Sequence, residues 1–145
     1  MSQQLLSEAE DIWTKLASIT DSCFAKKDAK DIAQQREEFW ETPTDQVIHN
    51  KKAGLAYHLG HLEAFHKATG GKAGRFTATG HTVGECKLWA VLHVILAHVK
   101  DNSVLEPYPG LRSFYEAVME TSECQALLAD GAQMPKAFGQ YLVKA

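Results

Sequence analysis

The sequence is poor in the features that mark secreted, membrane-spanning and nucleic-acid-binding proteins. It holds three cysteines, Cys23, Cys86 and Cys124, an odd number that forms neither a CxxC pair nor a zinc-ligand pattern. It has no apolar run long enough to span a bilayer, and its net charge of −3 supplies no basic surface for a phosphate backbone. We therefore expect reduced thiols, no membrane span and no nucleic-acid partner.

The first residues also lack a targeting signal. Residues 1–6 carry no basic side chain, and the acidic residues Glu8, Glu10 and Asp11 arrive before any long apolar run. A secretory signal requires a basic start followed by an apolar stretch. We therefore expect a cytoplasmic protein.

The sequence does contain apolar residues at helical spacing. Its composition, 45% hydrophobic and 23% charged, is that of an ordinary globular protein. A chain of 145 residues can bury one continuous apolar core without disulfides. We expect a single helical domain over residues 1–145, with its core at about 7–130 and an irregular tail at 131–145.

Capping signals predict where the first helices begin. Ser7-x-x-Glu10 is a capping box, and the apolar stripe behind it predicts a helix from Ser7 to about Ala25. Asp28 is expected to cap a second helix, which Pro43 ends. Residues 45–69 then keep helical spacing up to a glycine pair, which predicts a third helix, the longest of the chain.

A second capping box, Thr82-x-x-Glu85, precedes the most apolar part of the sequence. Residues 83–98 leave almost no polar face, so we expect a helix that is buried on nearly every side and forms the centre of the domain. The turn at 107–110 introduces a further amphipathic helix, and Ser122-x-x-Gln125 is predicted to cap a short last one.

The order of these elements resembles the C-terminal, helical domain of cytosolic glutathione transferases, with the sigma-like class the most similar. The segment Gly80–Trp89 looks like the family's capping motif at its central helix, with Thr82 at the Ser/Thr cap and Glu85 in place of the usual aspartate. Tyr108–Leu111 is similar to the family's Phe-Pro-x-Leu, and Leu59–Glu63 to its Leu-x-x-Leu-Glu. The resemblance implies an all-α, glutathione-transferase C-terminal-like helical bundle with a buried central helix.

The sequence departs from the family pattern at several points. Gly84 stands where the family has alanine, Ser122 stands where it often has proline, and the loop before the cap is shorter than usual. No strand–helix–strand pattern precedes Ser7, so the thioredoxin-like half that holds and activates glutathione in that family is expected to be absent. The resemblance therefore implies no catalytic residue in this chain, no cofactor, and glutathione as co-substrate only in combination with a thioredoxin-like half.

The resemblance also implies which residues would form a site. Asp21 matches the carboxylate that reaches the glutathione of the neighbouring subunit, where it would receive the glutamyl ammonium. A solvent-facing helix acid is the commoner role for such a residue. The residues expected to line the hydrophobic electrophile pocket are Trp13, Cys23, Phe24, Trp89, Phe138 and Tyr141. Plain core packing is the alternative for the two tryptophans, Cys23 and Phe24. For the tail residues Phe138 and Tyr141 the alternative is a loose segment.

The seven histidines raise the question of a metal site. On a helix His58 and His61 share a face, whereas His61 and His66 point in different directions. Two ligands without a fixed third donor make a weak site, so we expect no metal. His93 and His98, in the buried segment, are expected to be hydrogen-bonded core or edge histidines.

Three functions are compatible with this sequence. The first is the helical half of a glutathione transferase, with a homodimer or a thioredoxin-like domain as partner and an exposed apolar surface where that domain packs. The second is a protein-interaction adaptor, as in translation elongation factor and aminoacyl-tRNA synthetase complexes, which requires a helix face with apolar and arginine-rich character. The third is a small-ligand carrier.

Overall fold

The computed structural model describes residues 1–41, 54–72, 74–96 and 102–129 of the chain. All regular secondary structure in these ranges is helical, which confirms the all-α class for the part of the chain described. The helices are α1 (Ser2–Phe24), α2 (Ala29–Glu41), α4 (Leu55–Ala68), α5 (Val83–Val94), the 3-10 helix η2 (Asn102–Leu105), α6 (Pro109–Met119) and α7 (Ser122–Ala129).

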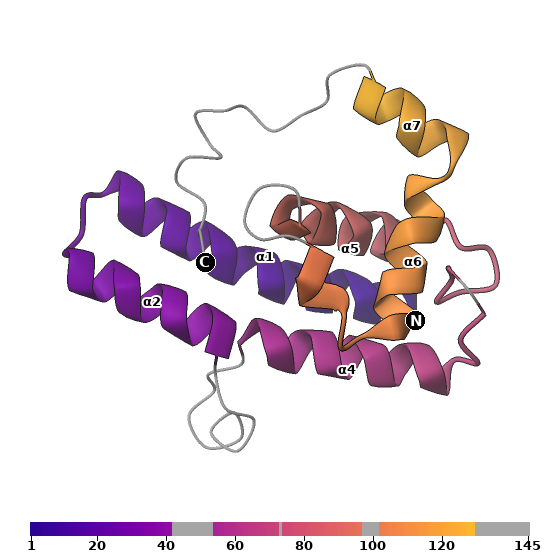
Figure 1. The fold of residues 1–145 in the computed structure, drawn as a ribbon, viewed down its shortest axis with the longest axis horizontal. Helices are drawn as coiled ribbons and strands as arrows, with labels where there is room; N and C mark the ends of the chain where they lie inside the picture. Colours follow the sequence, from indigo (N-terminus) through magenta and orange to yellow (C-terminus); the bar gives the residue numbers. More distant parts are fainter. Residues whose placement is uncertain (42–53, 73, 97–101, 130–145) are drawn as a thin grey trace.

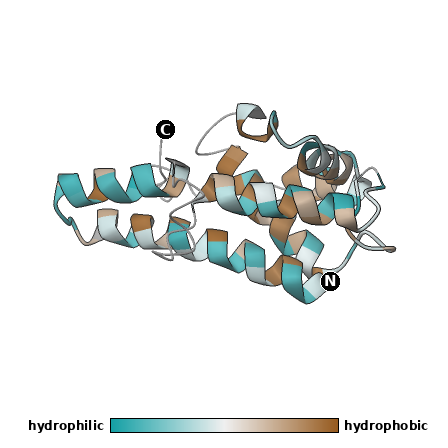
Figure 2. Cartoon of the chain, turned by 90° about the horizontal axis from the view of Figure 1, so that it is seen from below, coloured by the Kyte–Doolittle hydropathy of each residue, from teal (hydrophilic) through white to brown (hydrophobic). Residues whose placement is uncertain are grey.

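The longest of these helices, α1, forms the axis of the arrangement (Figure 1). It packs most extensively on α5, and α2 and α4 also contact it. Helix α6 crosses beside α4 and α5 and carries α7 at its end. Hydrophobic residues lie mainly where helices meet, while hydrophilic residues dominate α2 (Figure 2). The fully buried side chains come from α1, α4, α5, η2 and α6, so these elements share one apolar core.

The start of α1 differs from the prediction. The helix begins at Ser2, five residues before the predicted cap Ser7, and its N-cap Met1 provides no side-chain hydrogen bond. The Ser7-x-x-Glu10 pattern therefore lies inside a helix. Leu5 is fully buried in the core, so tertiary packing extends the helix beyond its local capping signal.

The predicted long helix is also wrong in its extent. Gly54 is the N-cap of α4 and has an extended conformation, so the helix does not run through this residue. Residues 42–53, which the prediction included in part, lie outside the described ranges. With 14 residues, α4 is shorter than α1, which has 23.

The capping prediction for α5 is confirmed. Thr82 accepts from the backbone N–H of Glu85, and the Glu85 carboxylate accepts from the backbone N–H of Thr82. The expected burial on nearly every side does not form: six of the twelve residues of α5 are buried, with Leu88, Val91 and Leu92 at most 2% exposed, whereas Val83, Cys86 and Ala90 are exposed. The predicted stretch 83–98 thus contains a helix, but it packs one face along α1, contacts α6 as well and leaves another face exposed, so it is not the fully buried centre that was expected. Residues 97–101 lie outside the described part.

Two further caps can be compared with the prediction. Asp28 accepts from the backbone N–H of Lys30 at 2.9 Å at the start of α2, as predicted. At α7 the cap is Thr121 rather than Ser122, because the Thr121 hydroxyl accepts from the backbone N–H of Cys124. Gln125 donates instead to the carbonyl of Met119, so the predicted capping box does not form.

The start of α1 approaches the start of α5 closely at Gly84. A Cβ atom on Gly84 would lie 2.1 Å from the Ser2 carbonyl oxygen and 3.0 Å from the Leu5 Cβ. The Gly84 N–H also donates to the Ser2 hydroxyl. This contact gives a physical reason for glycine at the position where the resembling family has alanine.

We expect Gly84→Ala to destabilise the protein by about 1–2 kcal/mol, because the clash with a backbone carbonyl outweighs the ~1 kcal/mol helix-propensity gain. Gly60→Ala is the matched control: no atom lies within 4 Å of a Cβ built there. This control should stabilise α4 by about 0.5–1 kcal/mol. Urea unfolding measures both, and a stabilised Gly84→Ala variant would show that the two helices do not meet in this way.

No helix among the described residues is long and apolar enough to cross a membrane.

Candidate functional site

A hollow lies between α1 and α4, and we call it the α1–α4 hollow. Its volume is about 210 Å³. One turn of α1 and one turn of α4 form the walls of the hollow, since residues three or four apart in a helix share a face. The lining residues are Gln4, Ser7, Glu8, His61, Leu62 and Phe65. The hollow therefore combines an apolar floor with a carboxylate and an imidazole.

Glu8 joins the two helices at the edge of this hollow. Its Oε2 atom lies 2.8 Å from His58 Nδ1, and its Oε1 atom lies 2.8 Å from His61 Nδ1. Each imidazole can donate its Nδ1–H to one carboxylate oxygen, which fixes the tautomer of both rings. The Glu8 carboxylate is thus oriented by two donors, and each of its oxygens keeps a second lone pair for another donor.

The two histidines differ in their surroundings. The His58 side chain is 6% exposed, and its Nε2 atom has no hydrogen-bond partner among the described residues. The His61 side chain is 57% exposed, and the Tyr57 ring packs against both imidazoles. The buried ring therefore anchors Glu8 to α4, while the exposed ring forms part of the wall of the hollow.

The surroundings of Glu8 favour its anionic form. The hydrogen bond from His58 has the largest effect and lowers the pKa of the Glu8 carboxyl group. Burial raises this pKa, and attraction to both imidazoles lowers it further. The net pKa lies below the ordinary value of 4.5. Near neutral pH the hollow therefore contains a fixed negative charge.

This shift predicts how stability depends on pH. A carboxyl group with a lowered pKa in the folded state stabilises the fold fully above its ordinary pKa. The contribution then falls as the pH decreases from that value toward the lower pKa of the folded state. We expect the free energy of unfolding to fall more between pH 6 and pH 3 in the wild type than in Glu8→Gln.

Glu10→Gln is the control for this measurement. Glu10 lies on the same helix and pairs with Lys87 at 2.9 Å, with half of its side chain exposed. It should keep the pH dependence of the wild type, measured by urea unfolding at each pH. Equal slopes for Glu8→Gln and the wild type would contradict a lowered Glu8 pKa.

The residues predicted from the sequence to form the site lie elsewhere. Asp21 is exposed near the end of α1, and Cys23 is a half-buried free thiol. Trp13 is half-buried with Lys87 Nζ 5.6 Å from its ring centroid. None of them lines the α1–α4 hollow. The roles of Asp21 toward glutathione and of Trp13 and Cys23 in a pocket stay predictions.

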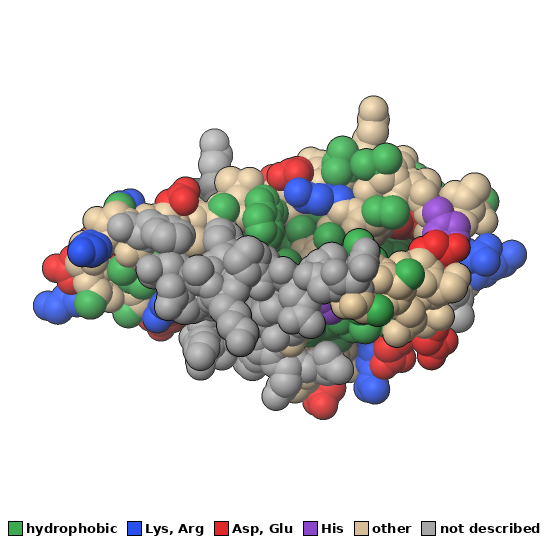
Figure 3. Space-filling model, turned by 90° about the horizontal axis from the view of Figure 1, so that it is seen from above, with side chains coloured by type: hydrophobic (Ala, Val, Ile, Leu, Met, Phe, Trp, Pro, Cys, Tyr) green, Lys and Arg blue, Asp and Glu red, His purple; other side chains and the backbone are tan. Residues whose placement is uncertain are grey.

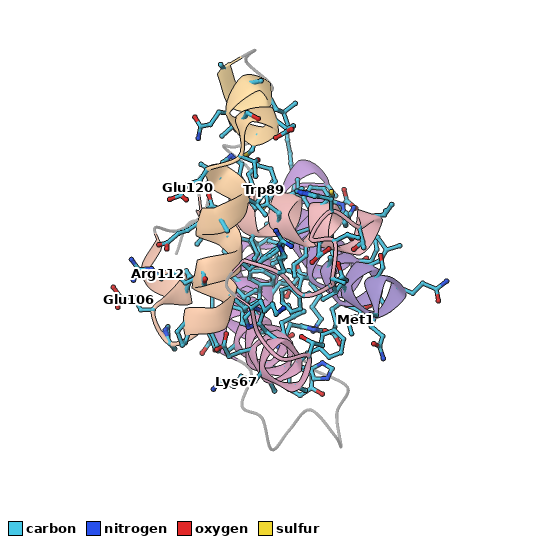
Figure 4. The ribbon with its side chains drawn as sticks, turned by 90° about the vertical axis from the view of Figure 1, so that its right-hand side faces the viewer. Met1, Lys67, Trp89, Glu106, Arg112 and Glu120 are labelled. Carbon is cyan, nitrogen blue, oxygen red and sulfur yellow. The ribbon has the colours of Figure 1, made fainter. Side chains whose placement is uncertain are left out.

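Trp89 is packed in a stack of rings. It lies 4.9 Å from the His93 ring and 6.3 Å from the Tyr115 ring, nearly parallel to both, where α5 approaches α6 (Figure 4). His93 Nδ1 is 3.0 Å from the Tyr115 hydroxyl, which confirms His93 as a hydrogen-bonded histidine. Burial raises the pKa of Tyr115, so its hydroxyl stays protonated and can donate to the imidazole.

The remaining predicted residues cannot be placed. Phe138, Tyr141 and His98 lie outside the described residues, and the side chain of Phe24 is not described. The shared face of His58 and His61 is confirmed by their common partner Glu8. In the described ranges no group of three or more histidine, cysteine, aspartate or glutamate residues could hold a metal ion.

The chain matches no protein-family model, no curated protein and no solved structure.

Nothing in the sequence indicated that Glu8 would be part of a site. Glu8 lies 50 residues before His58 and 53 before His61, so only the packing of α1 on α4 brings them together. The pairing of His58 and His61 on one helix face was the available signal. A single sequence does not reveal which acidic residue of another helix lies opposite.

Proposed function

We propose that this chain is a glutathione-transferase-like helical domain that contributes an electrophile-pocket wall and a dimer surface, without catalysis of its own. The thiolate of glutathione would be formed by a thioredoxin-like partner domain. In this proposal Asp21 receives the glutamyl ammonium of glutathione bound to a neighbouring subunit.

The observation that supports the proposal best is the capping box at α5. Thr82 and Glu85 form both reciprocal hydrogen bonds, and the helix that they begin buries one face against α1. This is the feature on which the resemblance to the family depends most. The order of the described helices is also compatible with it.

An exposed apolar end of the molecule is a second supporting observation. Met1 is 55% exposed and Val83 is 72% exposed, and the contact between Ser2 and Gly84 places both residues at the same end of α1 and α5. Elsewhere, as on the face seen in Figure 3, hydrophobic side chains lie among charged ones of both signs. An apolar end next to the capped helix is where a second domain could pack.

The adaptor function has less support in the described part of the chain. The three arginines lie on different elements, Arg36 on α2, Arg75 in the loop before α5 and Arg112 on α6. Arg112 is occupied by Glu116 at 2.8 Å. These positions do not form the arginine-rich helix face that a protein-interaction hot spot would use.

The test combines binding and turnover. The isolated chain is passed over immobilised glutathione and assayed with an activated aryl halide, alone and after mixing with the thioredoxin-like domain of a sigma-like glutathione transferase. We expect turnover only in the mixture. Asp21→Asn should raise the KM for glutathione about tenfold, the effect of losing one charge-assisted hydrogen bond, while Asp11→Asn on the same helix should not.

Two outcomes would contradict this proposal. Turnover by the isolated chain would show that it contains the activating group. No association with a thioredoxin-like domain, together with purification of the chain in a stable multi-protein complex, would favour the adaptor function instead.

A further inference from the structure

The α1–α4 hollow has the size of a site for a small molecule. A dry apolar cavity of ~150 Å³ is large enough to bind benzene, and this hollow measures about 210 Å³. Leu62 is 1% exposed and Phe65 is partly buried, so the floor is apolar and fixed by the core. A single aromatic ring with a short substituent fits these dimensions.

The charge of the hollow indicates which charge the substituent of such a ligand should have. Glu8 is the only acidic residue among the six that line the hollow, and no lysine or arginine lines it. Lys87 pairs with Glu10, and Lys15 is attracted to Asp11 and Glu38, so these cations have other partners. The carboxylate of Glu8 therefore lies at the hollow with no lysine or arginine among the lining residues.

The hydrogen-bonding capacity points to a donor with several N–H groups. The two imidazoles occupy one lone pair on each Glu8 oxygen, and the second lone pairs remain as acceptors. The hydroxyl of Ser7 and the amide oxygen of Gln4 are further acceptors on the same wall. An ammonium group, with three donors and no acceptor, matches this set, whereas a carboxylate ligand would be repelled by Glu8.

We propose that the α1–α4 hollow binds a small primary arylalkylammonium ion, with its ammonium group on Glu8 and its ring against Leu62 and Phe65. This site is independent of the proposed function, because it involves neither glutathione nor the surface of α5. The bond from the buried His58 holds the carboxylate in place before the ligand arrives, which reduces the entropy lost on binding.

The experiment compares three ligands of one shape. Phenylethylammonium, phenylethanol and phenylpropanoate are titrated into the full chain near neutral pH, and binding is followed by NMR through the signals of His61 and Phe65. We expect the ammonium ion to bind at least about tenfold more tightly than the alcohol, as a charge-assisted hydrogen bond implies, and the carboxylate to bind most weakly.

Three variants locate the site. Glu8→Gln should remove the preference for the ammonium ion over the alcohol. Ser7→Trp should abolish binding of both, because Ser7 is exposed and the larger side chain fills the hollow without removing a core residue. Glu10→Gln, on the same helix but outside the hollow, should bind as the wild type does.

The outcomes are distinct. Equal affinity for the ammonium ion and the alcohol, or an unchanged preference in folded Glu8→Gln, would overturn the proposal. Binding that persists in Ser7→Trp would place the ligand elsewhere and would also overturn it. Neither result bears on turnover with a thioredoxin-like partner, so this proposal and the proposed function fail separately.

Discussion

Replacing Glu85 by alanine is expected to cost about 3–5 kcal/mol of stability, because several donors would lose a charged acceptor and each buried donor left unsatisfied costs about 1–3 kcal/mol. Glu85 is 1% exposed and lies in the first turn of α5. Its carboxylate accepts from the backbone N–H groups of Phe76, Thr77 and Thr82, at 2.9, 3.0 and 3.1 Å. It also accepts from the hydroxyls of Thr77 and Thr82. Alanine would leave these donors without their acceptor and would release the loop before α5.

The pH dependence of this network has the same sign as that of Glu8. Burial alone would raise the pKa of Glu85, but the hydrogen bonds from Thr77, Thr82 and Phe76 outweigh it, so the net pKa lies below 4.5. The stabilisation is therefore complete above that value and is lost at lower pH, as the carboxyl group takes up a proton.

Chemical unfolding of three variants tests the network. Glu85→Gln keeps one acceptor oxygen and should fall between the wild type and Glu85→Ala. Glu123→Ala is the control, because Glu123 also lies in a first helical turn, that of α7, but is exposed. A Glu85→Ala variant as stable as Glu123→Ala would show that the loop is not held through this carboxylate.

Replacing Glu63 by alanine is expected to cost about 2–4 kcal/mol, because two backbone donors in a largely buried place would lose their acceptor. Glu63 lies on α4, is 7% exposed, and caps a different helix. Its oxygens accept from the backbone N–H groups of Gly110 and Leu111, at 3.0 and 2.9 Å, in the first turn of α6. The carboxylate also interacts favourably with the positive end of that helix dipole.

The capping of α6 depends on a glycine beneath the carboxylate. A Cβ on Gly110 would lie 2.9 and 3.0 Å from the Glu63 oxygens and 2.6 Å from His66 Nδ1. Urea unfolding of Glu63→Ala, with the exposed Glu120→Ala at the other end of α6 as control, measures the contribution. If both variants unfold at the same urea concentration, Glu63 does not hold α6.

Local signals in the sequence predicted most of the described helices, and tertiary contacts explain the misplaced start of α1 and the missed cap of α6. The box at Thr82 and the cap at Asp28 form as expected, because each involves residues close in sequence. The start of α1 was misplaced because Leu5 and the contact with Gly84 extend the helix beyond Ser7. The cap of α6 could not be found, since its acceptor lies 47 residues earlier, on α4.

The candidate site was harder to predict from the sequence than the fold. The apolar stripe of α4 and the pairing of His58 with His61 follow from helical periodicity. The identity of their partner follows only from the way in which α1 packs on α4. The residues chosen by resemblance, such as Asp21 and Trp89, do not line the α1–α4 hollow, and their roles stay predictions.

The packing of α1 on α5 has a consequence for how the chain is made on the ribosome. Ser2 contacts Gly84, 82 residues later in the sequence, and α5 is the main packing partner of α1. At roughly 5–20 residues per second, ~4–16 s pass between the synthesis of these two residues. The apolar stripe of α1 therefore stays uncovered by α5 for at least this interval.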